Sequence, residues 1–308
     1  MSTQTQSKPV AAGAESPEST PAQAVVQKAI SEITHIATLP EVTLKIVKLV
    51  EDPDSTAQDL NNVISHDPAL GARILKVVNS AFYGLPGQIG SINRAIVLLG
   101  MNAVKNIAIA ASLAKLFRGG AICPQFNARD LWTHSIAVAA CTRLLSKRIR
   151  LGLPDEAFLG GLIHDLGLMV EMQARRPQLV EAFQQMERRP ELTLRQAEIE
   201  AMGASHEDFG AGLCKLWKFP ASFIYVTGHH HHPRDVHPRN RSLVGLVHVS
   251  DVISARLMLG FTRSVETTEL DTELLQELNI TPEIIAEVEK ELPAAIQEAT
   301  ALLQDGGA

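Results

Sequence analysis

The stretch Ala157–Gly167, AFLGGLIHDLG, places a histidine and an aspartate side by side at the end of an apolar run. The sequence predicts a helix from Asp155 to Leu166, with Gly167 just after its end. Successive residues of a helix point about 100° apart, but near a helix end two neighbouring side chains can turn towards one cation. His164 and Asp165 are therefore candidate metal ligands.

The rest of the chain continues this helical pattern. From Val25 onward apolar residues recur at helical spacing, and the alternation typical of β-strands is rare. Asp67 with Pro68 predicts one helix start, and Ser91 predicts another, for a helix that Gly100 ends. We therefore predict an all-α fold. The other expected helices span about residues 103–117, 130–150, 205–217 and 242–259, with further starts at Thr193, Pro220 and Pro282.

Composition divides the chain into parts. Residues 1–24 hold Ser, Thr, Pro, Gln, Ala and Gly with hardly any large apolar side chain, and they are expected to form a disordered tail. The pair Gly119-Gly120 predicts a boundary between an N-terminal helical lobe over residues 25–118 and a second lobe over residues 119–260. Residues 261–308 are expected to form C-terminal helices and a tail.

Bulk properties exclude several classes of protein. The chain of 308 residues is 45% hydrophobic, which is enough for a sizeable core, and its net charge is −6. No global basic field exists, so nucleic acid and a membrane surface are not expected partners. No apolar run is long enough to span a bilayer, and three widely spaced cysteines indicate free thiols. We therefore expect a cytoplasmic protein.

Further histidines and carboxylates stand at helix ends and inside apolar helices. His134 comes four residues after Asp130, so the two side chains share one helix face. His206 begins an expected helix, and residues 229–232 are four consecutive histidines. Asp251 lies inside an apolar helix, where a carboxylate is costly to bury unless it is paired or bound to metal.

Two interpretations fit these residues. Taken singly, each residue has an ordinary structural role. Asp130 can pair with a helix dipole, His134 can be a core histidine with a hydrogen-bond partner, and His206 can be the neighbour of a helix cap. Asp251 can pair with Arg256. Taken together, so many ligand-type residues in one lobe indicate a metal site. Neutral imidazole with carboxylate suits Fe, Mn, Zn, Ni or Co, and two bridged ions could activate water for attack on a phosphoester.

The ordered series of a histidine, a His-Asp pair, more histidines and a late aspartate resembles the HD superfamily of metal-dependent phosphohydrolases. The N-terminal lobe is more specific, because its motifs resemble the HD-related output domain, HDOD. The resemblance covers about residues 25–259. It is carried by Leu39-Pro40, Ile64–Leu70, Asn79–Gly84, Ser91–Gly100, Leu131–Ser135, Ala157–Gly167, Glu200–His206 and His230–Pro233.

This resemblance implies an all-α bacterial signalling module that is commonly non-enzymatic, because many members have lost HD ligands. Here residues stand at most ligand positions, and Asp130 stands where HD-GYP enzymes can place an extra metal-binding Glu. Enzymatic features are incomplete, however. Leu168 stands in place of the lysine of the HD-GYP cyclic-di-GMP phosphodiesterases, and no Glu-Arg or Gly-Tyr-Pro follows His230-His231.

We therefore expect an HDOD signal-transduction output protein that binds one or two divalent ions and acts through contacts with other signalling proteins. One alternative is a metal-dependent phosphohydrolase acting on a nucleotide or cyclic di-nucleotide. Another is a cyclic-di-nucleotide receptor that binds without cleaving. The His-His-x-Pro register favours His230 and His231 within the histidine run. The expected metal ligands are Asp130, His134, His164, Asp165, His206, His230, His231 and Asp251.

Overall fold

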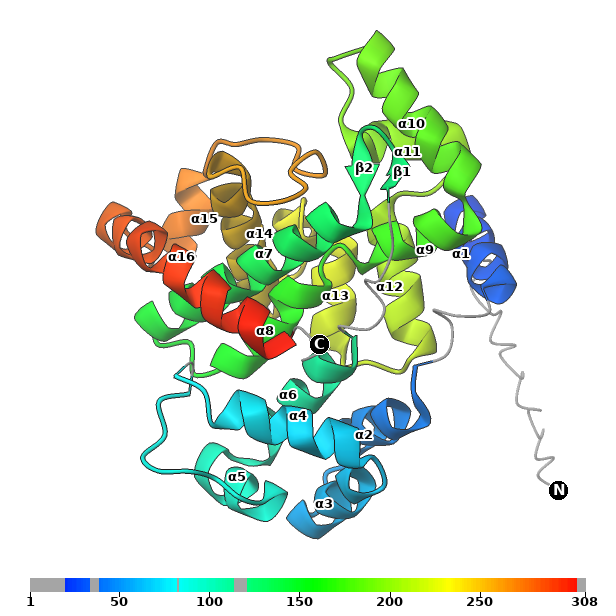
Figure 1. Cartoon of the computed structure of the whole chain (residues 1–308). Helices are drawn as coiled ribbons and strands as arrows, with labels where there is room; N and C mark the ends of the chain where they lie inside the picture. Colours follow the sequence, from blue (N-terminus) through cyan, green and yellow to red (C-terminus); the bar gives the residue numbers. More distant parts are fainter. Residues whose placement is uncertain (1–19, 34–38, 82, 114–120, 304–308) are drawn as a thin grey trace, which may run out of the picture.

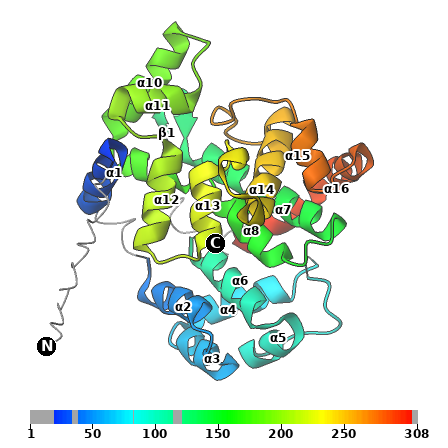
Figure 2. The same cartoon turned by 180° about the vertical axis from the view of Figure 1, so that it is seen from behind.

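The computed structural model describes residues 20–33, 39–81, 83–113 and 121–303. The described part of the chain is all-α, as predicted, apart from two short strands. A smaller lobe holds helices α2 to α6, and a larger lobe holds the helices from α7 onward (Figures 1 and 2). The smaller lobe consists of α2 (Glu41–Glu51), α3 (Ala57–Ser65), α4 (Pro68–Val78), α5 (Ile92–Leu99) and α6 (Met101–Leu113).

The larger lobe surrounds the long helix α7 (Ala128–Arg148), which packs against α8, α14 and α16. Within the described residues, none of the helices has both the length and the apolar composition needed to cross a bilayer. The remaining helices are α8 (Pro154–Ile163), α9 (Leu166–Ala174), α10 (Arg176–Arg188), α11 (Leu194–Met202), α12 (His206–Leu216), α13 (Ala221–His229), α14 (Pro238–Arg256), α15 (Thr272–Glu277) and α16 (Pro282–Leu303), with the short 3₁₀ helix η1 (Pro233–Asp235).

Side-chain caps begin several of these helices where the sequence predicts them. Asp67 accepts a hydrogen bond from the Leu70 amide, and Ser91 caps α5 in the same way. Thr193 and Ser205 each form a capping box with a residue three positions later. Each cap satisfies backbone amides that a helix start leaves without partners. The cap at Ser205 fixes where His206 enters the lobe.

Two features differ from the sequence-based expectation. The sequence predicts a helix through Leu166 that Gly167 follows, but α8 ends at Ile163 and α9 begins at Leu166. Gly167 therefore lies inside a helix, where a side chain would overlap the carbonyl of His206. A small antiparallel hairpin, β1 (Ala121–Cys123) with β2 (Phe126–Asn127), also precedes α7. The Gly119-Gly120 boundary lies outside the described residues.

Close packing of α8 on α7 sets the position of the His-Asp pair. A Cβ atom at Gly161 would lie 2.8 Å from the Ala139 Cα atom and 2.8 Å from the Thr142 hydroxyl oxygen. Glycine thus lets the α8 backbone touch α7 directly, because any larger side chain would separate the two helices. His164 follows three residues later and is carried into the centre of the larger lobe.

Helix α1 (Pro21–Glu32) packs against α12 and α9 of the larger lobe. The expected N-terminal lobe starts at residue 25, whereas this first helix lies with the second lobe in the structure. Gly212 on α12 explains the close approach, because a Cβ atom there would collide with the side chain of Val26. Residues 21–24 form the first turn of α1, and the rest of the expected tail lies outside the described residues.

Candidate metal centre

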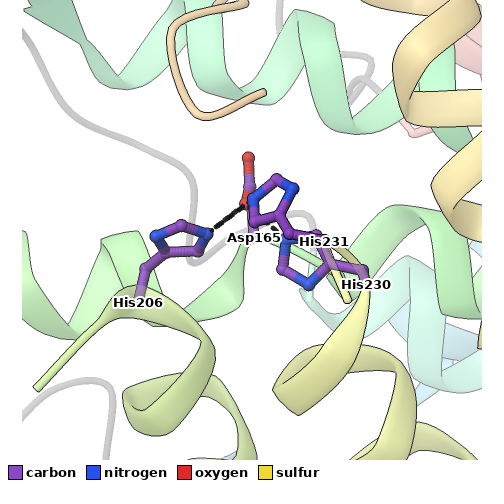
Figure 3. Close-up of side chains that lie close together, drawn as sticks. All are labelled: Asp165, His206, His230 and His231. Carbon is purple, nitrogen blue, oxygen red and sulfur yellow. Dashed lines mark hydrogen bonds and ion pairs between the residues drawn. The ribbon is translucent and has the colours of Figure 1, made fainter. Parts of the chain in front are cut away.

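Seven candidate ligands gather at one point inside the larger lobe. His134 comes from α7, the His164-Asp165 pair from the junction of α8 and α9, and Asp251 from α14. Four of the seven are drawn together in Figure 3. Six are at most 1% exposed, and His231 is 8% exposed. The full set is His134, His164, Asp165, His206, His230, His231 and Asp251.

Asp165 lies at the middle of the group, and both of its oxygen atoms face imidazole nitrogens. Its Oδ1 is 3.4 Å from His230 Nε2 and 3.7 Å from His206 Nε2 (Figure 3). Its Oδ2 is 3.3 Å from His164 Nε2 and accepts a 3.0 Å hydrogen bond from the Ser264 hydroxyl. One carboxylate therefore links the two sides of the centre.

Asp251 forms the opposite wall. Its Oδ1 lies 2.8 Å from His134 Nε2 and 3.8 Å from His164 Nε2. Its Oδ2 lies 3.8 Å from His231 Nδ1. The aspartate is thus paired with histidines inside the lobe. The alternative partner considered from the sequence, Arg256, is a residue of the last turn of α14.

Four of the histidines have their Nδ1 atom occupied by an acceptor. His134 Nδ1 donates to the Leu259 carbonyl at 3.0 Å, His164 Nδ1 to the Gly161 carbonyl at 2.7 Å and His230 Nδ1 to the Val226 carbonyl at 3.2 Å. A carbonyl oxygen only accepts, so each Nδ1 carries the proton. The lone pair of each neutral ring is therefore on Nε2, which faces the two aspartates.

His206 follows the same rule with a carboxylate as its acceptor. Its Nδ1 lies 2.7 Å from Glu198 Oε2, and its backbone amide donates to the same oxygen at 2.9 Å. Its Nε2 lies 3.0 Å from His231 Nε2. The His231 backbone amide donates to Glu207 Oε1 at 3.0 Å. Metal-ligating histidines characteristically hold the second ring nitrogen against a carboxylate or carbonyl in this way.

Several inward-facing atoms of the centre have no hydrogen-bond partner among the described residues. They are buried, and buried polar atoms without partners are rare in folded proteins. Lone pairs of nitrogen and oxygen therefore face one another without a donor between them, which is the arrangement that a cation completes. These atoms are His164 Nε2, His230 Nε2, Asp165 Oδ1 and Asp251 Oδ2.

Electrostatics inside the lobe reflect this concentration of acceptors. Burial lowers the pKa of His164, but the nearby charge of Asp165 outweighs burial and raises the pKa to about 9. Burial likewise opposes the charge of Glu198 at His206, whose pKa is raised to about 10. Without metal, protons therefore supply the positive charge that the centre requires.

The pKa values of Asp165, Asp251 and His231 are all lowered. Burial by itself raises the pKa of Asp165, but the charges of His164 and His206 hold it well below its usual range. The close contact with His134, whose Nε2 is 2.8 Å from Oδ1, holds the pKa of Asp251 low against the same effect of burial. Burial and the neighbouring His230 hold the pKa of His231 well below the ordinary histidine value. Charged carboxylates and a neutral imidazole are the forms that ligate metal.

The donor atoms divide into two overlapping sets. Asp165, His206, His230 and His231 offer atoms within 4.8 Å of one another, and so do His134, His164 and Asp165. Asp165 belongs to both. Nitrogen and oxygen donors in these numbers suit borderline divalent ions such as Zn²⁺, Mn²⁺ or Fe²⁺. The residues therefore fit one ion, or two ions that share Asp165.

The structure does not bring Asp130 into this group. It lies in the first turn of α7 with an exposed side chain, whereas His134, one turn later, is fully buried. Four-residue spacing places two side chains on one face, but the helix end carries the earlier one out of the core. The Asp130 backbone carbonyl instead accepts a hydrogen bond from the Phe261 amide.

Sequence reasoning missed the carboxylates and the hydroxyl that surround the ligands. Glu198 and Glu207 are buried against histidines, and Ser264 is fully buried against Asp165. A signal for Glu207 existed, because it directly follows His206. Ser264 carried none, since it lies 99 residues from Asp165 in a loop.

The two-lobed helical fold and its buried histidine and aspartate centre define a protein of the HD superfamily type. A family model described as the HDOD domain matches residues 36–233, which is more than half of the chain. The chain therefore belongs to the HDOD family. A relative from Treponema pallidum, an uncharacterised protein, is 24% identical over 200 residues, and the match covers 65% of this chain and 38% of that protein.

Solved structures share this fold. An HDOD domain protein of unknown function from Geobacter sulfurreducens superposes with a TM-score of 0.74 at 22% identity, covering 91% of this chain and 97% of that one. A protein from Shewanella amazonensis, provisionally named a phosphohydrolase, gives a TM-score of 0.68 at 24% identity, with 91% and 98% covered. A protein from Marinobacter aquaeolei, provisionally named a signal transduction protein, gives 0.69 at 21% identity, with 91% and 64% covered.

Proposed function

We propose that this HDOD protein is a bacterial signalling output protein that holds one or two divalent metal ions in its buried centre and acts through contacts with other proteins. The observation that carries the metal is the orientation of the imidazoles. The Nδ1 atoms of His134, His164, His206 and His230 are occupied by carbonyl or carboxylate acceptors, and their Nε2 atoms face Asp165 and Asp251.

Burial of the centre supports a regulatory role over turnover. His164, Asp165 and His206 are fully buried, so a nucleotide could reach them only after the lobe opens. Leu168, which stands where HD-GYP phosphodiesterases carry a lysine, is also fully buried. A metal enclosed in this way stabilises the fold around it.

Exposed apolar side chains support the role of protein contacts. Val97 is 75% exposed and Leu98 is 39% exposed, next to each other on α5 of the smaller lobe. Met258, two residues beyond the end of α14, is 76% exposed. Neighbouring apolar residues on a surface favour contact with a partner.

Three cysteines support a reducing compartment, which we take to be the cytoplasm. Cys141 and Cys214 are buried free thiols, and burial raises the pKa of each to about 12. Thiols held in this protonated form are unreactive. Cys123 is a free thiol as well.

A metal-dependent phosphohydrolase is the second candidate. The observation that favours it is the pair of donor sets sharing Asp165, because two ions joined by one carboxylate form a frequent hydrolytic site. Bound ions would supply Lewis acidity towards a phosphoryl oxygen and lower the pKa of water. This chain's own residues would hold the ions, with Glu198 and the backbone carbonyls orienting the imidazoles.

Metal-loaded protein incubated with a panel of nucleotides and cyclic di-nucleotides in Mn²⁺ or Fe²⁺ separates the two candidates. The output function predicts metal without turnover. Turnover that Asp165→Ala abolishes in a folded protein would establish the hydrolase instead. A nucleotide that binds without being cleaved would indicate a receptor.

A further inference from the structure

The centre is closed by a segment that lies beyond the residues matched by the family model. Leu259–Glu266, which we term the covering segment, belongs to the loop between α14 and α15 (Figure 1). After it the chain continues through the rest of this loop to the C-terminal helices α15 and α16. Helix α16 packs on α7 and also contacts α4 of the smaller lobe.

Both ends of the covering segment touch residues of the centre. At its start, the Leu259 carbonyl accepts the Nδ1 proton of His134 at 3.0 Å. Further on, the Ser264 hydroxyl donates to Asp165 Oδ2 at 3.0 Å, and Ser264 is fully buried. At its end, Glu266 Oε2 lies 3.3 Å from His232 Nε2. His232 directly follows the candidate ligand His231. The segment therefore spans the centre from His134 to the histidine run.

Close packing fixes the middle of the covering segment. Gly260 has a φ of +72°, and any side chain there would overlap the backbone of Asp130 and His134. The Phe261 amide donates to the Asp130 carbonyl at 3.0 Å. The Phe261 ring lies edge-on to Phe126, with ring centres 4.8 Å apart. The segment is thus docked on α7 and the hairpin by backbone and ring contacts.

We propose that Ser264 is a positioning residue of the metal centre, and that docking of the covering segment is coupled to metal occupancy. This inference rests on the proposed metal-binding function. The Ser264 hydrogen bond holds Asp165 Oδ2, which leaves Oδ1 directed at His206 and His230. It therefore fixes the carboxylate that both donor sets share.

Metal binding and docking of the segment involve the same two side chains, Asp165 and His134. A metal ion that immobilises them also immobilises the Asp165 oxygen that accepts from Ser264 and the His134 nitrogen that donates to Leu259. Less conformational entropy is then lost when the segment docks, so the docked state is favoured. By reciprocity, weakening the docked segment weakens metal binding.

Hydrogen exchange of the wild-type full chain, with and without saturating Zn²⁺, tests the coupling directly. The account predicts slower exchange in the peptide containing Phe261 to Glu266 when Zn²⁺ is bound. The Phe261 amide is the reporter, since it is bonded to the Asp130 carbonyl only while the segment is docked. Equal exchange rates in a protein that demonstrably binds Zn²⁺ would overturn the inference and leave the proposed function standing.

A matched pair of variants tests the positioning role. Ser264→Ala removes the hydroxyl on Asp165, whereas Thr262→Ala removes a half-buried hydroxyl two residues earlier on the same segment. We expect Ser264→Ala to weaken Zn²⁺ binding about tenfold, which is at the lower end of the losses seen when a residue that hydrogen-bonds a metal ligand is removed. Thr262→Ala should leave Zn²⁺ binding unchanged. Absorption of bound Co²⁺ in the visible range should shift in Ser264→Ala alone.

Different results would contradict the proposed metal binding and the role of Ser264. A wild-type protein that binds neither Zn²⁺ nor Co²⁺ would overturn the proposed function and this inference together. Wild-type metal affinity and an unchanged Co²⁺ spectrum in Ser264→Ala would overturn the positioning role alone. Equal losses in Ser264→Ala and Thr262→Ala would also contradict it, because a merely structural effect of the segment explains that result.

Discussion

Glu198 and His206 are joined across the turn between α11 and α12, with Glu198 Oε2 2.7 Å from His206 Nδ1. The same carboxylate oxygen accepts the His206 backbone amide at 2.9 Å. Both residues are fully buried. One buried carboxylate therefore fixes the tautomer, the ring orientation and the backbone of a candidate ligand.

Glu198→Gln should weaken Zn²⁺ binding by about tenfold or more, because a neutral amide orients the imidazole less strongly. Competition with a chromophoric chelator measures the affinity. Glu200→Gln is the matched control, since Glu200 lies on the same helix but is exposed and pairs with Arg189. Equal affinities of the two variants would contradict an orienting role for Glu198.

Stability of the metal-free protein should depend on pH through His164 and His206. Their pKa values of about 9 and about 10 in the folded state exceed the ordinary value of 6.5. A raised pKa means that the folded state binds the proton more tightly, so this contribution is complete below pH 6.5 and is lost as the pH rises through 9 and 10.

Thermal unfolding across this pH range measures the effect. The metal-free melting temperature should fall as the pH rises above 6.5. The increase in melting temperature on adding Zn²⁺ should grow over the same interval, because the ion no longer competes with protons. A Zn²⁺ effect that shrinks with rising pH would argue against imidazole ligands.

Glu171 on α9 is a buried acid whose two carboxylate oxygens have no hydrogen-bond partner among the described residues. Burial, followed by the charge of Glu198, raises its pKa well above the ordinary value. The folded state therefore favours the protonated form, and stability is lost as the pH rises above about 4.5. Glu171→Gln keeps the shape without this titration.

We expect Glu171→Gln to raise the melting temperature near pH 8 by a few degrees and to change it little near pH 4. Glu269→Gln, which alters an exposed carboxylate, provides the reference and should behave like the wild type. A lower melting temperature of Glu171→Gln near pH 8 would show that the folded protein requires a charged Glu171.

Gly161→Ala should destabilise the protein by about 1–3 kcal/mol, because the new methyl group would meet the Ala139 backbone of α7. Movement of α8 would also displace His164, so Zn²⁺ affinity should fall with stability. Chemical denaturation of the metal-free protein measures the first effect. Gly90→Ala, at a position with nothing close to the added atom, should be nearly neutral.

Much of the architecture could be predicted from the sequence because its signals are local. Asp67, Ser91, Thr193 and Ser205 cap their helices where the sequence places them. The His164-Asp165 pair also predicts the metal centre, because two adjacent ligand-type residues in an apolar stretch are costly to bury without a partner.

Other parts depend on contacts between distant segments and could not be predicted. Gly167 reads as a helix stop, yet it lies inside α9 because His206 approaches it from another helix. Ser264 meets Asp165 across 99 residues. Asp130 shares a face with His134 in the helical pattern, but the pattern does not show where the core ends.

The metal content of the protein purified without an affinity tag tests the central claim most directly, with Asp165→Ala and Asp130→Ala measured beside the wild type. Asp165 belongs to both donor sets, whereas Asp130 is exposed. The account predicts one or two divalent ions per folded wild-type chain, the same content in Asp130→Ala, and loss of metal from folded Asp165→Ala. A folded wild-type protein that neither retains nor takes up divalent metal would contradict it.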